Sequence, residues 1–91
     1  MAFEILWTED SETHIARHGI TPGEVEDALY SRPRWVAPGR SDTRLVFAQN
    51  SAGRHLLVVL ADALDGRGYV VTARDMTDTE RHAFTEKGRS G

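Results

Sequence analysis

The architecture of this chain follows from one segment, Tyr69-Val70-Val71-Thr72-Ala73-Arg74-Asp75-Met76-Thr77-Asp78-Thr79-Glu80-Arg81. The segment begins with the β-branched run Val70-Val71-Thr72, which favours a strand. It ends in Thr77-Asp78-Thr79-Glu80, which has the form of a capping box. In such a box the Thr77 hydroxyl accepts a hydrogen bond from the Glu80 amide, and the Glu80 carboxylate reaches back to the Thr77 amide. The segment therefore predicts a strand that runs straight into a helix.

Arg74 lies at the junction between that strand and that helix. By strand alternation it shares a face with Thr72 and Val70. A cation at the end of a strand, beside the start of a helix, can face a cleft without being buried. We therefore take this end of the predicted sheet as the candidate functional end.

Length and composition bound the class of protein. The chain has 91 residues, of which 40% are hydrophobic, and this predicts a single domain over residues 1–91 with one modest core. The absence of cysteine excludes disulfides and thiolate chemistry and suits a reducing cytosol. The longest apolar run, Leu56–Ala61, is too short to span a bilayer, and the N-terminus lacks the pattern of a secretory signal. We expect a cytoplasmic protein without membrane contact.

Charge is distributed unevenly along the chain. Residues 1–30 hold seven acids and one base, whereas residues 31–60 hold five arginines and one acid. The net charge of −3 argues against tight nucleic-acid binding by charge alone. Ten of the eleven bases are arginine, which suits bidentate contacts to phosphate or carboxylate. A host with GC-rich coding would favour arginine as well.

The N-terminal third predicts a strand and two helices. Residues 3–7 alternate apolar and other side chains, as a short strand does. Residues 8–18 predict a short amphipathic helix that ends at Gly19. Thr21-Pro22-Gly23-Glu24 is a second capping box with proline at the first helical position, and this helix is expected to end near Ser31 because Pro33 disfavours helical geometry before it.

The rest of the chain predicts a loop, a hairpin, a strand and a helix. Residues 32–42, with two prolines and three arginines, are expected to be a basic loop. Residues 45–48 and 54–61 predict a hairpin around a turn at residues 50–53, with the second strand central because it is apolar on both faces. A loop over residues 62–68 leads into the opening segment. A last helix is expected from Asp78 to about Lys87, followed by a frayed tail over residues 88–91.

The predicted order is β-α-α-β-β-β-α. Consecutive strands joined by short turns make an antiparallel meander. The fold class is therefore α+β, with a small antiparallel sheet and helices packed on one face.

An ordered set of motifs carries a resemblance to a known family. The set comprises Trp7, Arg17-His18-Gly19-Ile20, Glu24-Val25-Glu26, Gly53-Arg54, Val70-Val71-Thr72-Ala73-Arg74-Asp75-Met76-Thr77 and Glu80-Arg81. It resembles the BrnT toxins of type II toxin–antitoxin systems over residues 3 to about 85. The resemblance implies a RelE-like fold, a translation-arresting endoribonuclease that acts on mRNA, and a cognate antitoxin that binds it in a hetero-oligomer.

The chain departs from the family pattern at three points. Ala16 stands where family members usually carry a base, the chain is acidic overall, and its last helix has Arg81 and His82 where the family tends to have a run of bases. An alternative function is therefore a RelE-like protein-interaction module without RNase activity. A solitary nucleic-acid-binding domain is disfavoured because no compact basic helix is present.

Metal-free RNA cleavage needs a base for the ribose 2′-OH, cations for the phosphate and an acid for the 5′ oxygen. The resemblance and the chemistry together nominate Arg74 and Arg54 as phosphate clamps, His18 as acid or base, and Glu80 as a further base. Each has a structural alternative. Arg74 could pair with a neighbouring carboxylate, and Arg54 could be a solvated strand-edge charge. His18 could stabilise a helix end, and Glu80 could serve only as the cap of the last helix.

Five further residues are candidate RNA contacts: Arg81, Arg44, Arg40, His82 and Trp35. Trp35 could stack on a base or close the end of the core. His55 alternates with Leu57 and is interpreted as partly buried structure. His14 and His18 would need a third ligand to hold zinc, so no metal site and no cofactor are expected.

Overall fold

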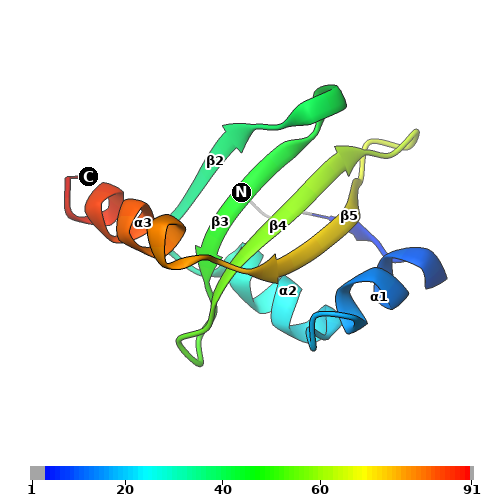
Figure 1. The fold of residues 1–91 in the computed structure, drawn as a ribbon. Coiled ribbons are helices and arrows are strands. Elements are labelled where there is room, and N and C mark those ends of the chain that lie inside the picture. Colours follow the sequence, from blue (N-terminus) through cyan, green and yellow to red (C-terminus); the bar gives the residue numbers. More distant parts are fainter. Residues whose placement is uncertain (1–3, 91) are drawn as a thin grey trace.

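The computed structural model describes residues 4–90, with side chains to residue 87, and it is a small α+β domain with a five-stranded mixed sheet and three helices (Figure 1). The elements follow the order β1 (Ile5–Leu6), α1 (Glu9–Ala16), α2 (Pro22–Tyr30), β2 (Arg34–Pro38), the 3₁₀ turn η1 (Arg40–Asp42), β3 (Arg44–Gln49), β4 (His55–Asp62), β5 (Gly68–Asp75) and α3 (Asp78–Ser90). The strand order across the sheet is β1-β5-β4-β3-β2.

The central hairpin forms as the sequence predicts. β3 and β4 pair antiparallel, with Val46 opposite Val58. The Asn50 side chain accepts hydrogen bonds from the Ala52 and Arg54 amides at 3.0 and 2.9 Å, and Gly53 takes a φ of +93° that disfavours other residues. β4 is the middle strand of the sheet, as its two apolar faces indicate.

All three predicted helix starts are capped by side chains. Thr21 and Glu24 form the predicted capping box of α2, and Thr8 with Ser11 forms one for α1. At α3 the Thr77 amide donates to Glu80 Oε1 at 2.9 Å, and the Glu80 amide donates to the Thr77 hydroxyl at 3.2 Å. Helix α3 continues to Ser90, three residues beyond the predicted end, and Gly91 lies outside the described residues.

The expectation that all helices lie on one face of the sheet is wrong. The larger core cluster packs α1 and α2 against one face of the sheet, and we call this the α1–α2 face; its fully buried members include Ile15, Val25, Val46, Leu56, Val58, Leu60 and Val70. Phe84 of α3 packs on the opposite face, the α3 face, with Phe47, Leu57 and Met76. Because β3 and β4 present large apolar side chains on both faces, each face needs a cover.

Two further expectations about the strands are corrected. The basic loop over residues 32–42 contains β2, an edge strand antiparallel to β3 in which Trp35 lies opposite Phe47. An edge position tolerates proline, so Pro38 did not prevent pairing. The sheet is also not wholly antiparallel, because β1 pairs parallel to β5. Phe3, expected in the first strand, lies outside the described residues.

A register shift changes the face on which the β5 side chains lie. Thr72 pairs with Val59 and Val70 pairs with Leu60, so Val71 is an extra residue on β5. Arg74 therefore shares the α3 face with Thr72, whereas Val70 points into the α1–α2 core. The predicted grouping of Arg74 with Val70 is wrong, because a bulge inverts the alternation.

Among the described residues, no helix combines the length and apolarity that crossing a bilayer requires.

Candidate functional site

At one end of the sheet β4 begins, β5 ends and α3 starts (Figure 1). Three charged groups of side chains lie at this end. One group surrounds Arg54 on the α1–α2 face. The second is the pair of Arg74 and Glu80 on the α3 face. The third lines a pocket between α3 and the start of β4. The four residues nominated as catalytic are thus distributed over two faces and do not form one cluster.

Arg54 ties the hairpin to both neighbouring parts of the chain. Its Nε donates to Asp75 Oδ1 at 2.7 Å and its Nη2 donates to Asp75 Oδ2 at 3.1 Å. Its Nη1 donates to Glu24 Oε2 and to the Gly19 carbonyl, both at 3.0 Å. A fifth hydrogen bond, from Nη2, reaches the His18 carbonyl at 3.3 Å. The guanidinium is therefore fully engaged with oxygen acceptors of the protein.

The charges of the Arg54 group stabilise one another. The hydrogen bond from Arg54 lowers the pKa of the Asp75 carboxyl from its ordinary value of 3.8. The backbone of Thr21, and then Arg54, lower the pKa of Glu24 from 4.5. The hydrogen bond to Asp75 in turn raises the pKa of Arg54. Because protein oxygens already accept from all of its N–H groups, Arg54 has no donor left for a phosphate, which disfavours a role in binding phosphate.

Arg74 makes a bidentate ion pair with Glu80. Its Nη1 and Nη2 lie 2.8 and 2.9 Å from the two carboxylate oxygens, and Nη1 also donates to the Asp75 carbonyl at 3.0 Å. Arg74, and then the Thr77 amide, lower the pKa of Glu80 from 4.5. A carboxylate with a lowered pKa that caps a helix and pairs with arginine is a poor proton acceptor. These contacts are the structural alternatives considered above, in which Arg74 pairs with a carboxylate and Glu80 caps the helix. The catalytic roles of both residues stay predictions.

His18 follows the end of α1 at Ala16 and is exposed. It therefore does not share a helix face with His14. The residues whose side chains the structure describes include no group of three histidine, aspartate or glutamate residues that could hold a metal ion.

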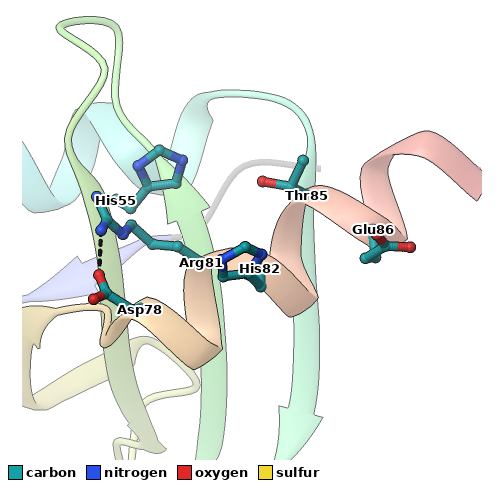
Figure 2. Close-up of a pocket in the computed structure, with 6 residues that line it drawn as sticks. All are labelled: His55, Asp78, Arg81, His82, Thr85 and Glu86. Carbon is teal, nitrogen blue, oxygen red and sulfur yellow. Dashed lines mark hydrogen bonds and ion pairs between the residues drawn. The ribbon is translucent and has the colours of Figure 1, made fainter.

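A pocket of about 680 Å³ lies between α3 and the start of β4 (Figure 2). His55 contributes from β4, and α3 contributes the remaining lining residues, which are Asp78, Arg81, His82, Thr85 and Glu86. Figure 2 shows the Arg81 side chain extending along the pocket toward His55, with His82 farther along the helix. The pocket joins two imidazoles and one guanidinium, residue types that can move a proton and bind a phosphate.

The His55 ring is held by packing, whereas Arg81 is held by a surface ion pair. The rings of His55 and Phe84 meet edge to face with centroids 5.7 Å apart, and the His55 carbonyl accepts from the Met76 amide at 3.1 Å. Arg81 pairs with Asp78 three residues earlier, and their side chains are 52% and 85% exposed. An exposed pair of this kind contributes only about 0–1 kcal/mol, so a phosphate can displace Asp78 at little cost.

The other nominated RNA contacts lie away from the pocket. Arg44 begins β3 and pairs with Asp62 at 2.6 Å. It lies roughly 17 Å along the strand from Gln49, which is opposite His55. Arg40 is exposed in η1, next to Arg44. Because Arg44 is opposite Leu60 of the α1–α2 core, it lies on the face of the sheet away from the pocket. The roles of Arg44 and Arg40 as RNA contacts stay predictions.

Trp35 stacks on Phe47 with ring centroids 4.7 Å apart, and the Lys87 ammonium lies 4.3 Å from the Trp35 centroid. The contact with the smaller core cluster fits the interpretation that Trp35 closes the end of the core. Its role in binding a base stays a prediction.

Sequence reasoning placed Arg81 and His82 among the RNA contacts but missed His55. The available signal was that His55 shares a strand face with Leu57 and stands at the same end of the sheet as the start of α3. The face of the sheet that α3 covers cannot be read from spacing, and that face decides which histidine meets Arg81.

The chain as a whole matches no family model, no curated protein and no solved structure.

Proposed function

We propose that this protein is the toxin of a type II toxin–antitoxin system, a metal-independent endoribonuclease with a RelE-like fold that acts on mRNA in the cytoplasm. Two independent supports meet here. The ordered motifs of the sequence resemble the BrnT toxins, and an open pocket groups two imidazoles with a guanidinium. The pocket carries the proposal, because it offers the residue types that the chemistry requires.

The proposed reaction cleaves RNA by attack of a ribose 2′-OH on the adjacent phosphorus. Charge accumulates on the phosphate oxygens in the transition state, and a positioned cation that binds this charge accelerates the step. Arg81 is the cation of the pocket. When RNA binds, Arg81 releases Asp78 and pairs with the phosphate. Arg54 and Arg74 keep the end of the sheet rigid through their carboxylate pairs.

The proposed protein partner is a cognate antitoxin that covers the α3 face and excludes RNA from the pocket. A short gene directly beside the toxin gene, encoding a small DNA-binding protein, would support this partner. Coexpression of that protein should restore growth and protect Arg81 from the arginine-modifying reagent phenylglyoxal.

A second candidate function is a protein-interaction module that has lost RNase activity. The observation in its favour is the neutralisation of both strand-end arginines, with Arg54 on two carboxylates and Arg74 on one. The net charge of −3 points the same way.

The proposal is tested by RNA cleavage with purified protein in EDTA, using end-labelled RNA. We expect fragments that end in a 2′,3′-cyclic phosphate. Arg81→Gln should lower the cleavage rate about 100-fold, because it removes one charged donor to the transition state. The same variant should relieve growth arrest when the gene is induced.

Arg67→Gln is the matched control. Arg67 also pairs with a nearby exposed aspartate, Asp65, at 2.6 Å, but it lies in the β4–β5 loop at the other end of the sheet. Its cleavage rate should equal that of the wild type. Equal losses in both variants would show that Arg81 acts only through general charge, and no cleavage by the wild type, with or without ribosomes, would favour the interaction module.

A further inference from the structure

We infer that His55 and His82 are the acid–base pair of this pocket, one removing the proton from the 2′-OH and the other protonating the 5′ oxygen. The inference rests on the proposed function and deepens it, because the motifs that suggested a toxin nominate neither histidine for this role. It is carried by the placement of the two imidazoles, from β4 and from α3, in the lining of one pocket.

The other nominated proton carriers are poorly placed. Glu80 is committed to Arg74 and to the Thr77 amide, and those contacts lower its pKa. His18 lies with the Arg54 group, on the α1–α2 face. Of the histidines that the structure describes, His55 and His82 are the two that line the pocket with Arg81, whose ion pair with Asp78 is exposed.

The two histidines are positioned in different ways. His55 is half-buried, and its contact with Phe84 fixes the orientation of the ring at the pocket wall. His82 is exposed on α3, one residue after Arg81. A fixed imidazole and an exposed one can each exchange a proton with a substrate that enters from solvent. Arg81 would bind the phosphate of that substrate. The carboxylates of Asp78 and Glu86 also line the pocket.

The step balances without any cofactor. One imidazole takes the 2′-OH proton as the 2′ oxygen forms a bond to phosphorus. The bond between phosphorus and the 5′ oxygen breaks, and the other imidazolium gives its proton to that oxygen. The products are a 2′,3′-cyclic phosphate and a 5′-OH, and the two histidines have exchanged protonation states.

The test compares two substrates with variants of each histidine. His55→Gln and His82→Gln should each lower the cleavage rate of RNA by about 10²- to 10⁴-fold. Uridine 3′-(4-nitrophenyl phosphate) has a leaving group that needs no proton, so the variant lacking the acid should regain a rate within about tenfold of the wild type on this substrate. The variant lacking the base should stay impaired on both. This contrast separates the two roles, and a merely structural residue would not produce it.

Two controls make the result decisive. His14→Gln alters an exposed histidine of α1 whose Nδ1 bonds the Asp10 carbonyl, and it should leave both rates unchanged. If His55→Gln lowers the thermal midpoint by losing the contact with Phe84, His55→Phe keeps a ring in that place and still lacks a proton carrier.

Each outcome decides between the claims. A wild-type protein that cleaves RNA while either histidine variant keeps its full rate would overturn the acid–base assignment and leave the proposed function standing. Impairment of both variants to the same extent on both substrates would also overturn the assignment. A wild type inactive on both substrates, and on RNA with ribosomes present, would overturn the function and the assignment together.

Discussion

The Val58→Asp variant is expected to be unfolded. Val58 is fully buried in the middle strand, between Val46 of β3 and Ala73 of β5, and it belongs to the larger core cluster. A carboxyl group there must either stay ionised in an apolar site or bind a proton, and both cost several kcal/mol. Because small domains are stable by only about 5–15 kcal/mol, we expect the far-ultraviolet circular dichroism of an unfolded chain and no cooperative urea transition.

Val36→Asp is the matched control for this substitution. Val36 lies in the edge strand β2 and is 46% exposed, so its new carboxylate stays hydrated. This variant should unfold cooperatively, with a free energy of unfolding within about 1 kcal/mol of the wild type. A soluble Val58→Asp protein with a normal transition would show that β4 is not the centre of the core.

The Arg54→Met variant should be destabilised by about 2 kcal/mol, because Asp75 and Glu24 lose the cation that both share. The Arg54 side chain is only 29% exposed, so solvent replaces these hydrogen bonds incompletely. The thermal midpoint should fall by roughly 10 °C. Arg44→Met provides the control, since Arg44 and Asp62 are 46% and 73% exposed, and this change should leave the midpoint nearly unchanged.

The same variant should change how stability depends on pH. Asp75 and Glu24 have a lower pKa in the folded protein than their ordinary values of 3.8 and 4.5. A lowered pKa stabilises the folded state above the unfolded-state pKa, and this stabilisation is lost as the pH falls through the folded-state pKa. The gap in free energy of unfolding between wild type and Arg54→Met should therefore be full at pH 7 and shrink below about pH 4. Urea titrations of both proteins at pH 7 and below about pH 4 measure this difference in free energy of unfolding. A difference that does not change with pH would contradict the role given to Arg54.

Local signals were sufficient to predict several elements. Thr21 with Glu24, and Thr77 with Glu80, marked two helix starts correctly, because a capping box is a contact between residues three apart. The turn at Asn50–Gly53 was equally local. The β-α-α opening and the central position of β4 followed from the same kind of short-range pattern.

Long-range pairing was not predictable in this way. Strand β2 exists because Trp35 and Val36 pair with Phe47 and Val46, yet its flanking prolines indicate a loop when the sequence is considered alone. The parallel pair of β1 and β5 joins residues more than 60 positions apart. Whether a helix covers one face of the sheet or the other also depends on contacts that no local pattern encodes.

The candidate site shows the same division. Arg74 lies at the junction of strand and helix as predicted, but its pairing with Glu80 was one of several possible carboxylate pairings. The extra residue Val71 places the side chains of Arg74 and Val70 on opposite faces of the sheet. The meeting of His55 with Arg81 and His82 required the crossing of α3 over the start of β4, so this pocket emerged only from the tertiary structure.

The measurement that tests the central claim most directly is the response of the four histidines to a bound RNA analogue. An oligoribonucleotide with 2′-O-methyl groups cannot be cleaved, and its titration can be followed by the ring resonances of His14, His18, His55 and His82 in NMR spectra. Our account predicts that the His55 and His82 signals shift together and saturably, whereas His14 does not respond. Shifts confined to His18, beside the Arg54 group, or no binding at all, would contradict it.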